Sequence, residues 1–288
     1  MEEVEKFYNK PLVSIIVNCF NGKEYLRDCL DSIYKQTYQN WELIFWDNQS
    51  KDNSKDIFKE YKDERFKYYL SSNHTSLYEA RDLAVKVCHG DFFTFCDVDD
   101  FWSEKRLEYL MPLFENKNVG IVYSNQWILD DKSKRKKKYT NKILPKGDLS
   151  SVIIDNPGVT ILNSIIKKSE YYKLKNGFNK KYKLIGDFDF FVRVAKSCQF
   201  DCVQMPLVYY RLHDNNFTKK NRETELSEFE DWFRNIKSLL SQEELETIYQ
   251  KILYKKVTIL ILKNNFKKLK DLLALLIPKK ILGKIKEY

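Results

Sequence analysis

Apolar runs and segments of helical periodicity alternate along the first hundred residues of the chain. The apolar runs are short, nearly continuous and rich in β-branched and aromatic residues, which is typical of strands buried on both faces. These predicted strands are 12–17, 41–46, 66–70 and 91–96. The predicted helices between them are 24–35, 54–61 and 76–88. Strands that alternate with helices indicate an α/β fold with a mostly parallel sheet, and such a sheet binds ligands at the carboxyl ends of its strands.

The alternation weakens after residue 100. The segments predicted there are a helix at 104–115, strands at 120–129 and 159–166, a helix at 187–197 and an extended segment at 200–210. A polar stretch at 130–150 contains the basic run 132–138, which we interpret as a solvated hairpin or loop. From about residue 222 the pattern is helical to the end of the chain.

The positive charge of the chain is concentrated at one end. The 288 residues carry a formal net charge of +9, and residues 251–288 alone hold eleven Lys against two acidic residues. The remaining residues therefore sum to zero, which disfavours a nucleic-acid binder because such proteins carry a basic body. Apolar residues interleave with Lys in this segment, and Pro278 is expected to break its helix. Two interpretations stay open: an interfacial helix on anionic lipid, or a helix packed on the rest of the chain with Lys outward.

The cysteines and the chain start indicate a cytosolic protein. None of the six cysteines forms a CxxC pair or stands at zinc-finger spacing, so we expect small buried thiols in a reducing compartment. The acidic start lacks the apolar core of a secretory signal, and no apolar run approaches the ~20 residues of a membrane-spanning helix. We expect neither a signal nor a span.

Three carboxylates follow directly on the apolar strand at 91–96. Asp97, Asp99 and Asp100 lie within four residues, and clustered carboxylates at the end of a buried strand repel one another. A divalent cation would remove that repulsion, and Mg²⁺ prefers one or two carboxylates together with phosphate oxygens. The alternative is a solvated acidic turn that precedes a helix.

Five other polar residues, in three segments, are candidates for chemistry. Asp47 ends the second strand, where an acid can accept hydrogen bonds from a base or ribose, or can form a turn. Asp187 and Asp189 alternate with aromatic residues, a setting that raises a carboxyl pKa and suits a general base, although a helix cap is equally compatible. Arg211 and His213 share one face of an extended segment and suit phosphate oxygens or a metal; a purely structural His is the alternative.

Taken in order, these motifs resemble the family 2 glycosyltransferases of the GT-A fold. The resemblance spans residues 11–215 and rests on the order and spacing of the motifs, each of which is weak alone. The segments that carry it are 11–21, 46–54, 73–82, 90–100, 177–178, 187–189 and 210–213.

The resemblance implies a metal-dependent, inverting transfer from a nucleotide-diphosphate sugar. The residues that would bind the nucleotide are Phe20, Asn21, Asp47, Arg81 and Asp97. Asp99 and His213 would hold Mn²⁺ or Mg²⁺, and Asp187 would be the catalytic base. The additional candidates for the site are Asp100, Asp189 and Arg211. A uridine nucleotide is the commonest donor carrier in the family, and many relatives act on lipid-linked acceptors.

The chain departs from the family pattern at four positions. The family usually has Pro where Asn18 stands and Gly where Gln49 stands. It usually has Asn at position 82, which is Asp here, and Glu at position 186, which is Gly here. None of these changes removes a candidate for the metal or the base.

The expected protein is a GT-A catalytic domain at 1–215, with a nucleotide half at 11–100 and an acceptor half at 101–215, followed by a helical extension at 216–288. It would build bacterial surface polysaccharide or glycolipid from the cytoplasm or the inner face of the plasma membrane. Contacts to the donor sugar are expected near residues 156–158. The alternatives are another nucleotide-sugar enzyme on this fold, either a retaining transferase or a nucleotidyltransferase, and a non-catalytic binding module on the membrane. The segment after the first strand lacks the Gly-rich basic loop expected of a nucleotidyltransferase.

Overall fold

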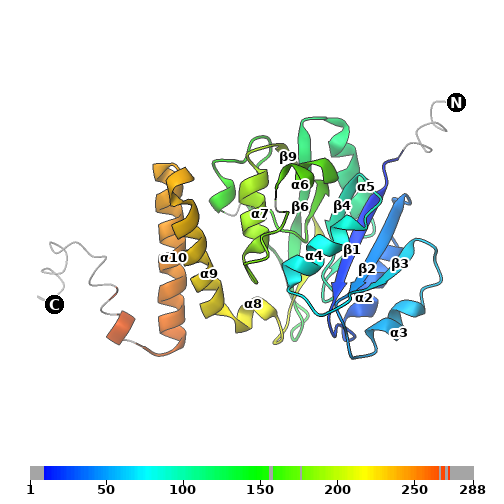
Figure 1. Ribbon diagram of the computed structural model, residues 1–288, viewed down its shortest axis with the longest axis horizontal. Coiled ribbons are helices and arrows are strands. Elements are labelled where there is room, and N and C mark those ends of the chain that lie inside the picture. Colours follow the sequence, from blue (N-terminus) through cyan, green and yellow to red (C-terminus); the bar gives the residue numbers. More distant parts are fainter. Residues whose placement is uncertain (1–9, 156–157, 176, 266, 270–271, 273–288) are drawn as a thin grey trace, which may run out of the picture. The chain divides into compact units, whose positions relative to one another are not determined.

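Two units make up the chain, Met1–Asn216 and Phe217–Tyr288. The computed structural model describes residues 10–155, 158–175, 177–265, 267–269 and 272 (Figure 1). The division between the units lies one residue beyond the predicted boundary at 215/216. Each unit is considered by itself below.

The first half of unit 1 is the parallel βα sheet that the sequence predicts. Its strands are β1 (Val13–Cys19), β2 (Trp41–Asp47), β3 (Phe66–Leu70) and β4 (Phe92–Phe95). The helices between them are α2 (Leu26–Tyr34), α3 (Ser54–Lys59) and α4 (Leu77–Lys86). β1 pairs in parallel with β2 and β4, and β2 pairs in parallel with β3. The carboxyl ends of β1, β2 and β4 therefore meet at one edge of the sheet.

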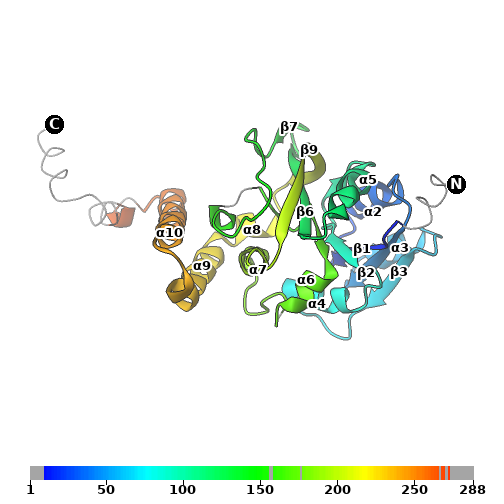
Figure 2. The same ribbon diagram turned by 90° about the horizontal axis from the view of Figure 1, so that it is seen from above.

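The second half of unit 1 extends the same sheet with mixed pairing. Its strands are β5 (Phe101–Trp102), β6 (Val119–Asp130), β7 (Lys136–Lys138), β8 (Ser164–Lys167) and β9 (Gln199–Leu212). Its helices are α5 (Arg106–Leu110), η1 (Met111–Glu115), η2 (Ile153–Asp155), α6 (Lys168–Lys173) and α7 (Gly186–Val194). The order is β3-β2-β1-β4-β8-β6-β9-β5, with β7 paired to β6. In unit 1, α2 and α5 lie on one side of the sheet, and α4 and α6 lie on the other (Figure 2).

Antiparallel pairing of β8 with β4 joins the second half of unit 1 to the first. β8 runs antiparallel to both β4 and β6, while β6 and β9 are parallel to each other. Residues 97–100, which follow β4, are called the acidic segment below. The end of β9 lies close to this segment, since Arg211 donates its backbone N–H to Asp100.

Two predicted elements differ from the structure for local reasons. The strand predicted at 159–166 begins only at Ser164, because the Asn163 amide donates to Ser124 and Gly158 and holds the preceding residues in a turn. The helix predicted at 104–115 changes from α to 3₁₀ geometry after Leu110, where Pro112 cannot donate a backbone hydrogen bond. The basic run 132–138 forms the β6–β7 hairpin, as predicted.

Unit 2 is helical. Its elements are α8 (Phe217–Lys220), α9 (Arg222–Ile236), η3 (Lys237–Leu239) and α10 (Gln242–Leu262). Ser241 and Glu244 form a reciprocal capping box at the start of α10. None of the helices within the described residues is long and apolar enough to cross a membrane. Most of residues 270–288, including Pro278, lie outside the described part of the chain.

The six cysteines are all free thiols. Four of them, at 19, 29, 88 and 96, are buried, and Cys198 and Cys202 are partly exposed. Burial raises the pKa of the Cys88 thiol to about 12, which keeps it protonated and unreactive at neutral pH. The prediction of buried structural thiols is confirmed for these four positions.

Candidate active site

The end of β1 presents an exposed aromatic ring at the carboxyl edge of the sheet. Phe20 is half-exposed and its ring packs on that of His74, with centroids 4.2 Å apart. The next residue, Asn21, has φ 55° and receives a hydrogen bond from the Lys51 N–H on its side-chain oxygen. Two flat rings at this edge form a surface on which a nucleotide base could stack.

Asp47 ends β2 and is almost fully buried. One carboxylate oxygen accepts the Ser50 N–H at 2.7 Å, and the other accepts the Tyr68 hydroxyl at 2.5 Å. Each oxygen retains a second lone pair, so a base could still donate to this group. Nearby, Gln49 has φ 70°, the backbone conformation that favours the Gly usual in the family. The amide of Asn18 is buried without a hydrogen-bond partner in the described part of the chain.

Arg81 is a buried cation at the centre of the site. It projects from α4, and its guanidinium lies 3.0 Å from an Asp97 carboxylate oxygen. The guanidinium carbon lies 5.2 Å from the centre of the Phe95 ring and 5.4 Å from that of Tyr78. Because Asp97 is a third exposed while Arg81 is enclosed, Arg81 holds this carboxylate at the surface of the site.

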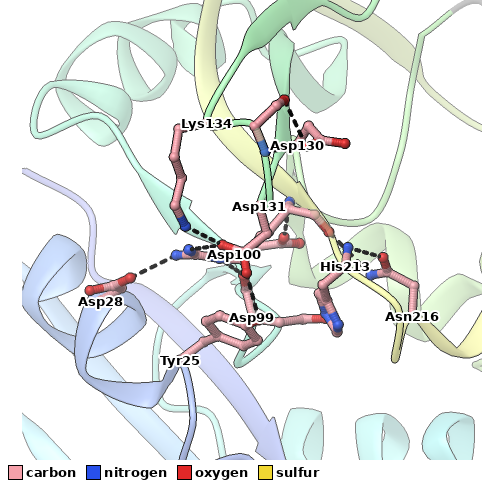
Figure 3. A network of polar contacts seen from close by, with 11 residues as sticks. Tyr25, Asp28, Asp99, Asp100, Asp130, Asp131, Lys134, His213 and Asn216 are labelled. Carbon is pink, nitrogen blue, oxygen red and sulfur yellow. Dashed lines mark hydrogen bonds and ion pairs between the residues drawn. The ribbon is translucent and has the colours of Figure 1, made fainter.

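Asp99 and His213 form the pair that the sequence proposes as metal ligands. The His213 Nε2 atom lies 2.9 Å from Asp99 Oδ2, and the His213 ring packs on Tyr25 at 5.1 Å (Figure 3). Burial raises the pKa of the Asp99 carboxyl, and the neighbouring charge of Asp97 raises it further. Within the described residues, no group of three or more His, Cys, Asp or Glu side chains is arranged to hold a metal. Any cation here would take two protein ligands and complete its shell with phosphate oxygens and water.

Asp100 faces the protein interior instead of the open edge. One of its oxygens accepts the Arg211 backbone N–H at 2.8 Å, and the other is buried without a partner among the residues described. Burial raises the pKa of Asp100 well above its usual range, and the charges of Asp99 and Asp97 add to this. Asp100 thus anchors the acidic segment to β9.

Arg211 connects four segments of unit 1, and its partners Asp28, Asp99 and Asp131 are labelled in Figure 3. Its Nε donates to the Asp99 carbonyl at 2.9 Å, one terminal nitrogen lies 2.7 Å from Asp28 on α2, and the other lies 3.2 Å from Asp131 after β6. Asp131 also accepts the Tyr25 hydroxyl. The guanidinium is committed to protein groups, so we assign Arg211 to positioning the acidic segment and not to holding phosphate.

Asp187 and Asp189 lie at the start of α7, and their side chains contact different residues. Asp187 accepts the Tyr78 hydroxyl at 3.2 Å and the Phe188 N–H at 2.8 Å, both on Oδ1. Burial raises the pKa of Asp187, and the Arg81 charge offsets part of that rise. Asp189 is buried and lies 2.8 Å from Arg193 on the same helix. Asp187 is therefore the acid of this pair that lies beside Arg81.

The structure brings most of the predicted residues into two neighbouring clusters. Asp97, Arg81 and Asp187 form one, and Asp99, His213, Asp100 and Arg211 form the other. Sequence reasoning missed Tyr68, Tyr78, Asp28 and Asp131. Tyr78 stands three residues before Arg81, a spacing that puts both on one helix face and that could have indicated it. The segment expected to contact the donor sugar falls largely on residues 156–157, which lie outside the described residues.

The parallel βα sheet, its antiparallel extension and the acids at one edge define the chain as a glycosyltransferase of the GT-A fold. It belongs to glycosyl transferase family 2, whose model matches residues 14–194. A curated relative is the UDP-Glc:α-D-GlcNAc-diphosphoundecaprenol β-1,3-glucosyltransferase WfgD of Escherichia coli. It is 26% identical over 219 residues, which cover 74% of this chain and 83% of the relative.

Two solved structures share the fold at low sequence identity. S. aureus TarS in complex with UDP-GlcNAc matches with a TM-score of 0.66 and 15% identity, covering 85% of this chain and 72% of that one. The mannosyltransferase PcManGT from Pyrobaculum calidifontis, in complex with GDP-Man and Mn²⁺, matches with a TM-score of 0.60 and 13% identity, covering 88% and 80%. Membership in this family favours the transferase over the nucleotidyltransferase and the non-catalytic module.

Proposed function

We propose that the chain transfers a sugar from a nucleotide-diphosphate sugar to a hydroxyl of a lipid-linked glycan, with inversion at the anomeric carbon. The observation that carries this proposal is the buried Arg81 between two acids, Asp97 at the end of β4 and Asp187 at the start of α7. This arrangement sets a base candidate beside the edge of the sheet where α/β proteins bind nucleotides.

A UDP-sugar is the proposed donor. The E. coli relative is named for UDP-glucose, and S. aureus TarS was solved with UDP-GlcNAc, whereas PcManGT was solved with GDP-mannose. In this chain the Phe20 ring would stack on the base, and Asp47 would accept a ring N–H through its remaining lone pair. The proposed acceptor is a sugar on a lipid diphosphate, because the name of the E. coli relative gives GlcNAc-diphosphoundecaprenol as its acceptor.

Asp99 and His213 would hold Mg²⁺ or Mn²⁺. Their donor set fits: one carboxylate and one imidazole lie 2.9 Å apart beside a second carboxylate, and burial with like charge makes the anionic form of Asp99 unfavourable. The cation would neutralise charge that develops on the leaving diphosphate.

Asp187 would remove the acceptor proton. Inversion requires the acceptor oxygen to attack the anomeric carbon in line with the departing diphosphate, and the attacking hydroxyl must lose its proton to a base within hydrogen-bonding reach. Partial burial raises the pKa of Asp187 towards the range that suits a general base.

A thermal-shift screen of UDP- and GDP-sugars, each with and without Mn²⁺, tests the donor and metal together. We expect a UDP-sugar to raise Tm in a manner that requires Mn²⁺ in the wild type and is lost in Asp99→Ala. Asp187→Asn should bind the same donor normally yet abolish transfer, because it lacks only the base. Near-normal turnover by either variant would overturn the assignment.

We also propose that unit 2 places the enzyme on an anionic membrane at its cytoplasmic side. Two lysines of α10, together with Lys263 at its C-terminal cap, could face lipid but are paired with glutamates of α9: Lys255 with Glu225, Lys256 with Glu230 and Lys263 with Glu223. Support for the proposal thus comes from exposed apolar side chains on α10, namely Tyr254, Ile261 and Leu262, and from the Lys surplus of residues 251–288.

Vesicle sedimentation tests the membrane proposal. The wild type should pellet with vesicles that contain phosphatidylglycerol and remain in the supernatant with neutral vesicles. Tyr254→Glu combined with Ile261→Glu should weaken pelleting severalfold, because both changes place charge on an apolar face. Ile143→Glu is the matched control, since Ile143 is an exposed apolar residue of unit 1. Equal pelleting of both variants would refute the proposal.

A further inference from the structure

The side chain of Tyr78 contacts Asp187, the proposed base, although the two residues are 109 positions apart in the sequence. It is buried on α4, and its hydroxyl is 3.0 Å from the Leu184 carbonyl oxygen and 3.2 Å from Asp187 Oδ1. The single hydroxyl proton can be donated to only one of these oxygens at a time. Donation to Asp187 favours the ionised carboxylate, which is the form that accepts a proton.

Gly186 is what allows the ring of Tyr78 to reach this position. A Cβ atom on residue 186 would lie 2.6 Å from Tyr78 Cδ2 and 2.7 Å from Cε2, far inside van der Waals contact. The φ of Gly186 is not in the left-handed region, so close approach of the ring and not backbone conformation requires glycine there. Gly is otherwise unfavourable within a helix, and here it begins α7 immediately before Asp187.

Both hydrogen bonds to the Asp187 carboxylate reach the same oxygen, Oδ1. Among the described residues, the Tyr78 hydroxyl and the Phe188 N–H are both directed at Oδ1. The charged group that faces the carboxylate from α4 is Arg81. With Oδ1 engaged in this way, Oδ2 is the oxygen that remains to receive a proton from an acceptor hydroxyl.

We propose that Tyr78 is a positioning residue for Asp187, that its hydroxyl fixes the carboxylate so that Oδ2 takes the acceptor proton, and that Gly186 serves to admit the Tyr78 ring. This inference rests on the proposed role of Asp187 as base. In the step concerned, the acceptor oxygen forms its bond to the anomeric carbon as its proton passes to Oδ2. The bond from that carbon to the diphosphate breaks, and the leaving group keeps the electron pair.

The first test is Tyr78→Phe, which keeps the ring on Gly186 and removes only the hydroxyl. We expect kcat to fall about three- to tenfold with the KM for the UDP-sugar unchanged, because a hydrogen bond to the base is lost and no donor contact is touched. The acid limb of the pH profile of kcat/KM should move up by roughly half to one pH unit, because the ionised carboxylate loses a donor.

Tyr171→Phe is the matched control. Tyr171 is also buried and donates its hydroxyl to a carboxylate, but to that of Asp82. It should lower Tm and leave the acid limb in place. A merely structural role for Tyr78 would make the two variants behave alike.

The second test is the coupling between positions 78 and 186. Gly186→Ala should lower kcat markedly in the wild type, because the new methyl group displaces the Tyr78 ring. In a Tyr78→Ala background the same change should have little further effect, because the space is open. An equal loss in both backgrounds would overturn the packing argument.

A substrate-free measurement covers the case in which a variant turns over too slowly. The pKa of Asp187 can be followed by ¹³C NMR with carboxyl-labelled Asp, the signal being identified by its disappearance in Asp187→Asn. Tyr78→Phe should raise this pKa and Tyr171→Phe should not; an unchanged pKa in Tyr78→Phe overturns the inference. If instead Asp187→Asn retains turnover, the proposed function fails first, which separates the two outcomes.

Discussion

Removing the Arg211 guanidinium should destabilise the protein and loosen its acidic segment together. Arg211→Met keeps the stem of the side chain but deletes three hydrogen bonds, to the Asp99 carbonyl, Asp131 and Asp28. The Asp28 side chain is 61% exposed, so its pair contributes at most about 1 kcal/mol.

The bonds to Asp99 and Asp131 contribute more. Asp131 is 21% exposed and keeps its bonds to Tyr25 and Lys134 in the variant, which limits the loss there. The Asp99 carbonyl loses the Nε donor outright, at a cost of about 1–3 kcal/mol. The total loss in unfolding free energy is therefore about 2–4 kcal/mol.

Urea denaturation at neutral pH measures this loss, with Arg27→Met as the matched control. Arg27 also pairs with a carboxylate, but its side chain and that of Glu60 are 55% and 54% exposed, so its removal should cost much less stability than removal of Arg211. Arg211→Met should in addition weaken Mn²⁺-dependent UDP binding about three- to tenfold, because the segment that carries Asp99 is then held to β9 by the backbone bond to Asp100 alone. Equal stability of the two variants would refute the role of Arg211 in connecting the four segments.

Three further outcomes are expected. Burial alone would raise the pKa of Glu42, but hydrogen bonds from Lys67, Ser14 and the His89 N–H lower it to about 2. The ionised form of Glu42 therefore stabilises the fold above about pH 4.5, and this stabilisation is lost as the pH falls towards 2. Glu42→Gln should therefore cost about 2–3 kcal/mol in neutral urea melts and almost nothing near pH 2; a pH-independent cost would contradict this. Gly177→Ala should lower Tm by several degrees in calorimetry, because φ is +42° and the new Cβ would lie 2.6 Å from Asp82 Oδ1. Ser241→Ala should cost about 1 kcal/mol through loss of the α10 capping box, visible as reduced helicity on heating of unit 2 and not as a change in donor binding.

The pattern of apolar and polar residues predicts the helices and strands well where burial of apolar side chains alone determines the element. The buried strands β1, β2 and β4 are runs of apolar residues with few alternatives, and β3 lies at the predicted residues 66–70. Boundaries shift where a side chain intervenes, as Asn163 does before β8. The antiparallel insertion of β8 between β4 and β6 depends on pairings between distant segments, which periodicity does not encode.

The candidate site shows the same division. The positions of Asp97, Asp99 and Asp187 follow from motifs, and the structure places the first two in the turn after β4 and Asp187 at the start of α7. The partners of these acids come from far along the chain: Tyr78 is 109 residues from Asp187, and Asp28 is 183 residues from Arg211. The one local sign for Tyr78 is its position three residues before Arg81 on α4, and Asp28 on α2 has none.

The configuration of the new glycosidic bond tests the central claim most directly. Purified protein, UDP-α-D-glucose, Mn²⁺ and an α-D-GlcNAc-diphospholipid acceptor would be incubated, and the anomeric configuration of the product read by ¹H NMR. Single displacement with Asp187 as base predicts a β-linked product from the wild type and none from Asp187→Asn. An α-linked product, or a β-linked product formed equally well by Asp187→Asn, would contradict the account.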